Sequence, residues 1–173
     1  AGAEQIARAV MAETGLRTVF HHHCGGYIET PDEIARFLER TDPALIGLVF
    51  DTGHALYGGG DSQPSALLDS LRRFQERVWY VHFKDVSAPV AAQARQMGLS
   101  YQQAVGTGVF CELGRGVVPF PAVLRELEDS GYHGWITAEQ DVLPGMGEPL
   151  KSARANRAYL DSLSPANPAG GMG

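Results

Sequence analysis

Four short apolar runs, each followed by a polar residue, recur along the chain at a nearly constant interval. They are residues 17–20 before His21, 46–50 before Asp51, 78–81 before His82, and 135–138 before Glu139. Runs of this length, rich in β-branched and aromatic residues, are typical of parallel strands buried on both faces. The first two intervals are 30 and 31 residues, the length of one strand-plus-helix unit in a (β/α)8 barrel of roughly 250 residues.

Helical patterns lie between these runs. Thr30 and Glu33 frame a proline in a capping box, which predicts the start of a helix. Apolar residues at helical spacing predict further helices over residues 65–75 and 120–128, and another over 4–13 at the beginning of the chain. Strands that alternate with helices predict an α/β fold with a parallel sheet.

The number of strands decides the architecture. A (β/α)8 TIM barrel needs eight strands, whereas this chain shows four and opens in a helix. We therefore predict the C-terminal half of a TIM barrel over residues 1–163, with the strands adjacent in sequence order and helices on the outer face. A homo-oligomer or a missing N-terminal half would supply the other strands. A self-contained four-stranded α/β layer is the structural alternative.

A half-barrel would leave the inner face of its sheet open. We expect that face to carry Phe20, Phe50, Val81 and Ala138, or their alternating neighbours.

The third unit carries an insertion, since His82 and Glu139 are 57 residues apart. We place it near residues 88–116, as about one extra helical segment, because Ala91, Ala94 and Met97 have a weak helical periodicity. It follows the carboxyl end of a strand, where barrel enzymes place their functional loops. The Pro/Gly-rich tail, residues 164–173, is predicted to be disordered.

Charge and cysteine content limit the classes of partner and the cellular compartment. The chain has 14 Lys+Arg against 20 Asp+Glu, a net charge of −6, and no basic run, which argues against nucleic acids and anionic membrane surfaces as partners. No apolar run approaches the roughly 18 residues of a membrane-spanning helix. Cys24 and Cys111 lie far apart without CxxC spacing, which favours a reduced, cytoplasmic setting.

The polar residues after the four runs point to a metal site. Side chains at the carboxyl ends of parallel strands converge on one pocket, and here they are His21, Asp51, His82 and Glu139. This mixed N/O set suits Mn²⁺, Co²⁺, Mg²⁺ or Zn²⁺, and the lack of a thiolate disfavours a structural zinc site. Each residue alone could merely cap its strand, but four at one structural position favour the metal.

Strand alternation divides the triple histidine. His21 and His23 point to one side and His22 to the other, so either His21 or His23 can share the pocket with Asp51. The alternation does not decide between these two.

Further polar residues lie close to the strand ends. His54 follows Asp51 through a tight turn at Gly53, and is a candidate substrate contact or a hydrogen-bonding group at the start of a helix. Lys84 shares the face of His82 and could polarise a substrate oxygen, whereas Asp85 is expected to brace the loop.

His133 precedes the last strand, at the end of the sheet opposite the site. We expect a structural role for it.

Several strings together resemble one known family. TVFHHHCGGYIETPDEI, GLVFDTGHALYGGGD, VHFKDV and GYHGWITAEQD are similar to the xylose-isomerase-like family of sugar isomerases and epimerases. The triple histidine, the DTGH strand end and the insertion QARQMGLSYQQAVGTGVF followed by LGRGVVPF resemble the inosose dehydratases of that family most closely. The resemblance covers residues 14 to about 160. It implies a (β/α)8 barrel whose divalent metal is held by Asp51, His82 and Glu139, with His21 where the wider family has a glutamate.

The chain departs from those dehydratases in two places. The dehydratases tend to have an extra acidic residue just after the last ligand, whereas here Gln140 and Asp141 follow Glu139 directly. Arg115 stands between two glycines where the dehydratases have a GDG-like turn. Arg115 is therefore a candidate substrate contact that would change which hydroxyl pattern or charge the pocket accepts.

The predicted chemistry follows from the metal and the histidines. A divalent ion that chelates a ketone oxygen lowers the cost of removing the neighbouring proton. Epimerases normally use two carboxylates for this, whereas one carboxylate with an imidazole suits β-elimination of water. We predict dehydration of inosose (2-keto-myo-inositol) in inositol catabolism with Mn²⁺ or Co²⁺, and Glu139, His23 and Lys84 as catalytic residues. A metal-dependent keto-sugar isomerase or epimerase and a non-catalytic sugar-binding half-barrel are the alternatives.

Overall fold

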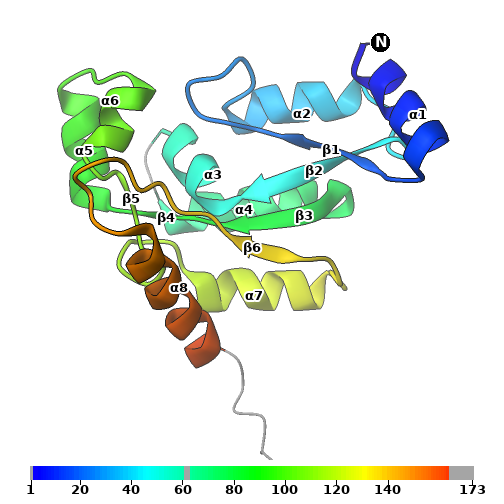
Figure 1. Ribbon diagram of the computed structural model, residues 1–173. Helices are drawn as coiled ribbons and strands as arrows, with labels where there is room; N and C mark the ends of the chain where they lie inside the picture. The colour runs from blue at the N-terminus through cyan, green and yellow to red at the C-terminus, as the bar shows by residue number, and fades with distance from the viewer. Residues whose placement is uncertain (1, 61–62, 164–173) are drawn as a thin grey trace, which may run out of the picture.

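A parallel sheet organises the molecule. The computed structural model describes residues 2–60 and 63–163, and within these ranges the sheet has four strands in the order β1-β2-β3-β6 (Figure 1). Their bounds are β1 (Thr18–His21), β2 (Ile46–Asp51), β3 (Val78–Phe83) and β6 (Ile136–Ala138). All three pairings are parallel. The prediction of parallel strands adjacent in sequence order, as in half of a TIM barrel, is confirmed.

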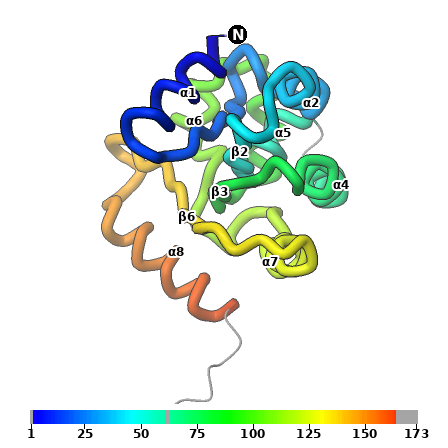
Figure 2. Tube along the Cα trace, turned by 90° about the vertical axis from the view of Figure 1, so that its right-hand side faces the viewer, coloured from blue at the N-terminus to red at the C-terminus, as the bar shows by residue number. Residues whose placement is uncertain are grey.

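Helices cover one face of this sheet. The helices are α1 (Gly2–Thr14), α2 (Pro31–Glu39), α3 (Thr52–Gly58), α4 (Pro64–Phe74), α5 (Ala88–Gln96), α6 (Tyr101–Gly106), α7 (Phe120–Asp129) and α8 (Pro149–Leu163), with a 3-10 turn η1 (Gln75–Arg77). Figure 2 shows α2, α4 and α7 together on the same side of the strands. The predicted capping box is present, since Thr30 accepts from the backbone N–H of Glu33 and the Glu33 side chain accepts in return.

The apolar core lies between the sheet and those helices. Leu48, Phe50 and Val81 are fully buried there, packed with helix residues such as Leu71 and Val123. Of the two predicted alternatives, the one that puts Phe50 and Val81 on the open inner face does not hold, because strand alternation turns these side chains toward the helices.

The alternating neighbours lie on the open face instead. Val19 is 37 % exposed, and Tyr80 and Thr137 hydrogen-bond each other across β3 and β6 at 2.7 Å. The carboxyl ends of the same strands carry the polar residues of the candidate site.

The segment between β3 and α7 is larger than the predicted extra helical segment. It holds α5, α6 and the short antiparallel pair β4 (Asp85–Val86) and β5 (Phe110–Cys111). The buried Asp85 carboxylate accepts from the backbone N–H groups of Gly114, Gly116 and Val118 at 2.8–3.0 Å. Asp85 therefore fixes the loop that follows β5, the bracing role predicted for it.

The predicted tail, residues 164–173, lies outside the described residues. Among the helices that the structure describes, none combines the length and the apolar character needed to cross a bilayer.

Candidate metal centre

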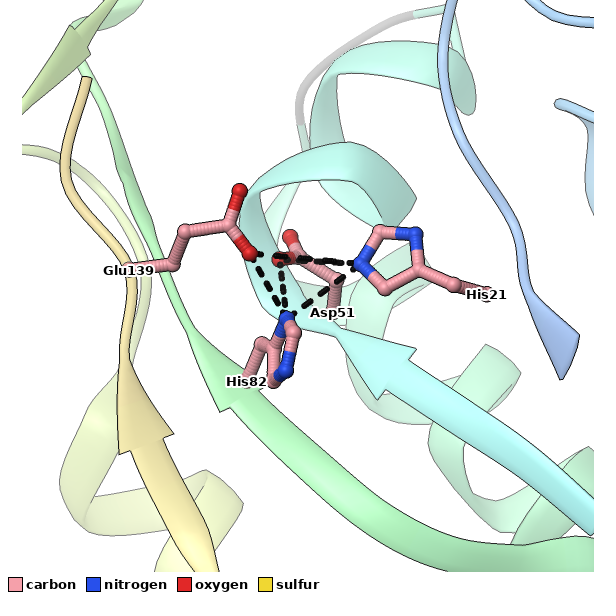
Figure 3. Close-up of side chains that lie close together, drawn as sticks. All are labelled: His21, Asp51, His82 and Glu139. Carbon is pink, nitrogen blue, oxygen red and sulfur yellow. Dashed lines mark hydrogen bonds and ion pairs between the residues drawn. The ribbon is translucent and has the colours of Figure 1, made fainter. Parts of the chain in front are cut away.

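Four side chains from four neighbouring strand ends meet in one place (Figure 3). His21, Asp51, His82 and Glu139 each offer one ligand atom, and these atoms all lie within 4.8 Å of one another. His21 Nε2 is 3.3 Å from His82 Nδ1 and 3.8 Å from Asp51 Oδ2. Two atoms that each bind one ion at about 2.1 Å lie about as far from each other as these atoms do. The four residues that the sequence predicted as ligands are thus close enough to share an ion.

Asp51 has a free oxygen in a buried setting. Its Oδ1 accepts from the backbone N–H of His54 at 2.7 Å and caps α3. Its Oδ2 is buried without a hydrogen-bond partner and faces the nitrogens of His21 and His82. Burial opposes ionisation of Asp51, but interactions with His21 and His82 outweigh it and hold the pKa below its usual range. A buried anionic oxygen that faces two imidazole nitrogens is a fitting ligand for a cation.

His82 and Glu139 form a tight pair. His82 Nδ1 lies 2.7 Å from Glu139 Oε2 and 3.6 Å from Asp51 Oδ2. Interactions with Asp51 and then Glu139 raise the pKa of His82 to about 9. The interaction with His82 also lowers the pKa of Glu139 to about 2. Both shifts favour a charged imidazolium–carboxylate pair between His82 and Glu139.

His21 and His23 have different surroundings. His21 belongs to the four-residue group, whereas His23 donates from Nδ1 to the carbonyl oxygen of Cys24 at 2.7 Å. The His23 ring also packs on His54, with ring centroids 3.9 Å apart. The geometry therefore favours His21 as the ligand and leaves Nε2 of His23 without a role in the group.

His22 hydrogen-bonds the backbone of Asp51. It is buried, as strand alternation predicts, and its Nε2 accepts from the backbone N–H of Asp51 at 3.3 Å. Burial lowers the pKa of His22 to about 4, so the ring stays neutral and keeps its acceptor at neutral pH.

His54 and Lys84 lie deeper than predicted. Their side chains are 0 % and 1 % exposed, and Lys84 Nζ lies 3.3 Å from His54 Nε2. Burial lowers the pKa of His54 to about 3. Burial also opposes the charge on Lys84, but the nearby Asp51 and Glu139 carboxylates raise its pKa above its usual value. Both side chains are enclosed by protein, and their predicted contacts with substrate stay predictions.

The other predicted residues lie apart from the group. Arg115 is exposed on the loop after β5 and pairs with Glu112 at 3.4 Å. His133 is exposed in the turn before β6, at the amino end of that strand. The structure does not bring either residue to the four predicted ligands.

Tyr101 is a residue that the sequence analysis missed. It is the first residue of α6 and its ring meets that of His23 edge-on, with centroids 4.8 Å apart. Ser100 and Gln103 form a capping box at this point. This motif was a readable signal for a helix that begins at Tyr101.

Curated relatives share much of this sequence. The chain is 38 % identical over 157 residues to an inosose dehydratase of Geobacillus kaustophilus, covering 91 % of this chain and 49 % of the relative. It is 39 % identical over 149 residues to an inosose dehydratase of Klebsiella pneumoniae, covering 86 % and 49 %. The chain thus spans about half the length of these curated relatives.

Solved structures share the fold at lower identity. A xylose isomerase domain protein from Planctomyces limnophilus matches with a TM-score of 0.66 at 23 % identity, covering 92 % of this chain and 52 % of that one. A probable 3-DHS dehydratase from Bacillus anthracis matches with a TM-score of 0.65 at 15 % identity, covering 95 % and 56 %.

A family model described as xylose isomerase-like TIM barrel matches residues 2–163. This range contains the parallel sheet and all four residues of the candidate metal centre. On this match, and on the relatives that share the sequence, the chain belongs to the xylose isomerase-like TIM barrel family.

Proposed function

We propose that this chain forms the metal-binding half of a hydro-lyase that dehydrates inosose, a small cyclic polyol ketone. The observation that carries the proposal is the His21–Asp51–His82–Glu139 group at four strand ends, in a chain whose curated relatives are named inosose dehydratase. We further propose Mn²⁺ or Co²⁺ as the ion, because both accept mixed imidazole and carboxylate ligands. A cytoplasmic setting stays part of the proposal, supported by the free thiols of Cys24 and Cys111 among the described residues.

The metal held by the four ligands would activate the ketone of the substrate. When bound, a divalent ion acts as a Lewis acid on a ketone oxygen and makes the neighbouring C–H bond more acidic. Glu139 would serve mainly as a ligand, because a carboxylate that binds the ion has its charge engaged there and is a weak base.

The proton transfers would then be carried out by His23. Its Nδ1 donates to the Cys24 carbonyl, so the neutral ring has its lone pair on Nε2. Nε2 can accept the proton from the carbon next to the ketone. The resulting imidazolium can protonate the hydroxyl on the following carbon, which leaves as water while the C=C bond forms.

The test uses a complete barrel. The chain is joined behind the N-terminal half of the Geobacillus kaustophilus relative, loaded with Mn²⁺ and given inosose. We expect a product that has lost one water and absorbs in the ultraviolet. The His23→Ala variant should lose turnover by about 100-fold or more with Mn²⁺ affinity unchanged, whereas His133→Ala should retain both.

Other outcomes would overturn the proposal in distinct ways. Exchange of a stereocentre in heavy water without loss of water would select a keto-sugar epimerase. Bound metal and bound inosose without turnover would select a sugar-binding half-barrel.

A further inference from the structure

The ammonium group of Lys84 is enclosed by three acceptors. Its Nζ lies 2.6 Å from Glu139 Oε1, 3.1 Å from Asp141 Oδ2 and 3.3 Å from His54 Nε2. It also lies 4.5 Å from the centre of the Phe110 ring. Of its three N–H donors, one is given to Glu139 and one faces His54, while Asp141 adds an ion pair without a hydrogen bond. Lys84 is therefore held by protein groups and can act through its neighbours.

The first neighbour is Glu139, whose two oxygens face different partners. Oε1 accepts from Lys84, while Oε2 lies 2.7 Å from His82 Nδ1 in the ligand group. A rotation of the carboxylate would break the bond to Lys84. Charge-assisted hydrogen bonds of this kind are short and directional, so Lys84 keeps Oε2 turned toward the metal position.

The second neighbour is His54, whose two ring nitrogens are both engaged. An ammonium has no lone pair, so Nε2 of His54 must be the acceptor of the 3.3 Å contact. The proton of the neutral ring then resides on Nδ1, which lies 2.8 Å from the buried Cys24 Sγ. The backbone N–H of Cys24 also points at Nδ1, at 3.4 Å, and favours the opposite tautomer. The charged ammonium opposes this weaker neutral donor, and without Lys84 the Cys24 N–H would prevail.

We propose that Lys84 is a positioning residue that orients Glu139 Oε2 toward the metal and fixes His54 as the Nδ1–H tautomer. The role toward Glu139 rests on the proposed metal centre, whereas the tautomer of His54 does not. The His23 ring, the proposed acid–base residue, packs directly on His54. The tautomer of His54 therefore sets the position of the ring proton beside His23.

The tautomer is tested by long-range ¹H–¹⁵N NMR of the metal-free chain. In the wild type we expect the His54 proton on Nδ1. Lys84→Met should move it to Nε2, and Lys84→Arg should restore Nδ1–H because a guanidinium also only donates. Lys151→Met, an exposed lysine on α8, serves as the matched control and should resemble the wild type.

The orientation of Glu139 is tested by Mn²⁺ titration of the same proteins. Lys84→Met should weaken binding by about 10–100-fold, the usual cost of losing a group that orients a ligand, and Lys84→Arg should recover most of it. Unchanged or tighter binding in Lys84→Met, or a wild-type His54 protonated on Nε2, would overturn the inference. A wild type that binds no Mn²⁺ would instead overturn the proposed function, and the NMR result would still decide the tautomer of His54.

Discussion

The imidazole of His82 must lose a proton before it can coordinate a metal ion. Interactions with Asp51 and then Glu139 raise its pKa to about 9, so we expect the ring to be protonated at pH 7 before an ion binds. Metal binding at that pH should therefore release a proton. We expect Mn²⁺ affinity to rise with pH up to about 9 and then level off.

Calorimetry in buffers of different ionisation enthalpy measures the number of protons released, which should be close to one at pH 7. A binding enthalpy that does not depend on the buffer would contradict this protonation state of His82.

Asp51 supplies the most deeply buried charge among the predicted ligands. It is fully buried, and its Oδ2 lacks a hydrogen-bond partner, so its removal takes away a charge and a coordination bond together. We expect Asp51→Ala to weaken Mn²⁺ binding by about 100-fold or more, beyond the loss usual for outer groups. Titration calorimetry compares it with His133→Ala, which should bind as the wild type does. Equal affinities in the two variants would remove the proposed site.

At the residue scale, the sequence predicted positions better than environments. His21, Asp51, His82 and Glu139 could be predicted as neighbours, because strand ends in a parallel sheet converge whatever surrounds them. The burial of His54 and Lys84 could not be predicted, because it depends on tertiary contacts. Phe110 and Asp141, for example, come next to Lys84 only in the folded chain.

At the element scale, α3 shows why a local pattern was misread. The glycine in DTGH suggested a tight turn, whereas the segment is a helix that begins directly after β2, with Asp51 as its N-cap. The alternative that His54 takes part in a hydrogen bond at the start of a helix agrees with this, through its backbone N–H. Gly53 is required for a tertiary reason, because a Cβ there would lie 2.5 Å from Lys84 Cγ and 2.8 Å from Lys84 Cβ. Those atoms belong to the stem of Lys84, which cannot move without carrying the ammonium away.

Replacement of Gly53 by alanine tests this reading. Gly53→Ala should lower the free energy of unfolding by about 1–3 kcal/mol through overpacking and weaken Mn²⁺ binding. Gly106→Ala in α6 is the matched control, because within the described residues nothing lies within 4 Å of its added Cβ. The control should be neutral or gain about 0.5–1 kcal/mol from helix propensity. Urea denaturation measures both variants, and equal stabilities would refute the packing argument.

The insertion shows the limit of periodicity for short elements. Its strands β4 and β5 have two residues each, too few for any alternation to be read. The Asp85 carboxylate, which holds the following loop through backbone N–H groups, is a tertiary contact that carries no sequence period.

At the scale of the whole molecule, the sheet has two free edges. In the part of the chain that the structure describes, β1 and β6 each pair with one strand only. Apolar side chains are exposed on or next to both edge strands: Val19 within β1, and Trp135, 79 % exposed, directly before β6. Half of a barrel could be predicted from the strand count, because closure requires eight strands. Which side chains stay uncovered depends on the alternation in each strand.

Free edges and uncovered apolar residues should make the chain associate with itself. Unpaired backbone groups on an edge strand are a template for pairing with another chain, and here the same edge also carries Val19. We expect the average mass in sedimentation equilibrium to rise with concentration. Val19→Lys should reduce that rise, because a charge on an edge strand opposes pairing. Met97→Lys, exposed at the end of α5 and on neither edge strand, should leave it unchanged. A wild-type chain that stays monomeric throughout would mean that its edges are protected, and the open half-barrel would then be the wrong description of the chain in solution.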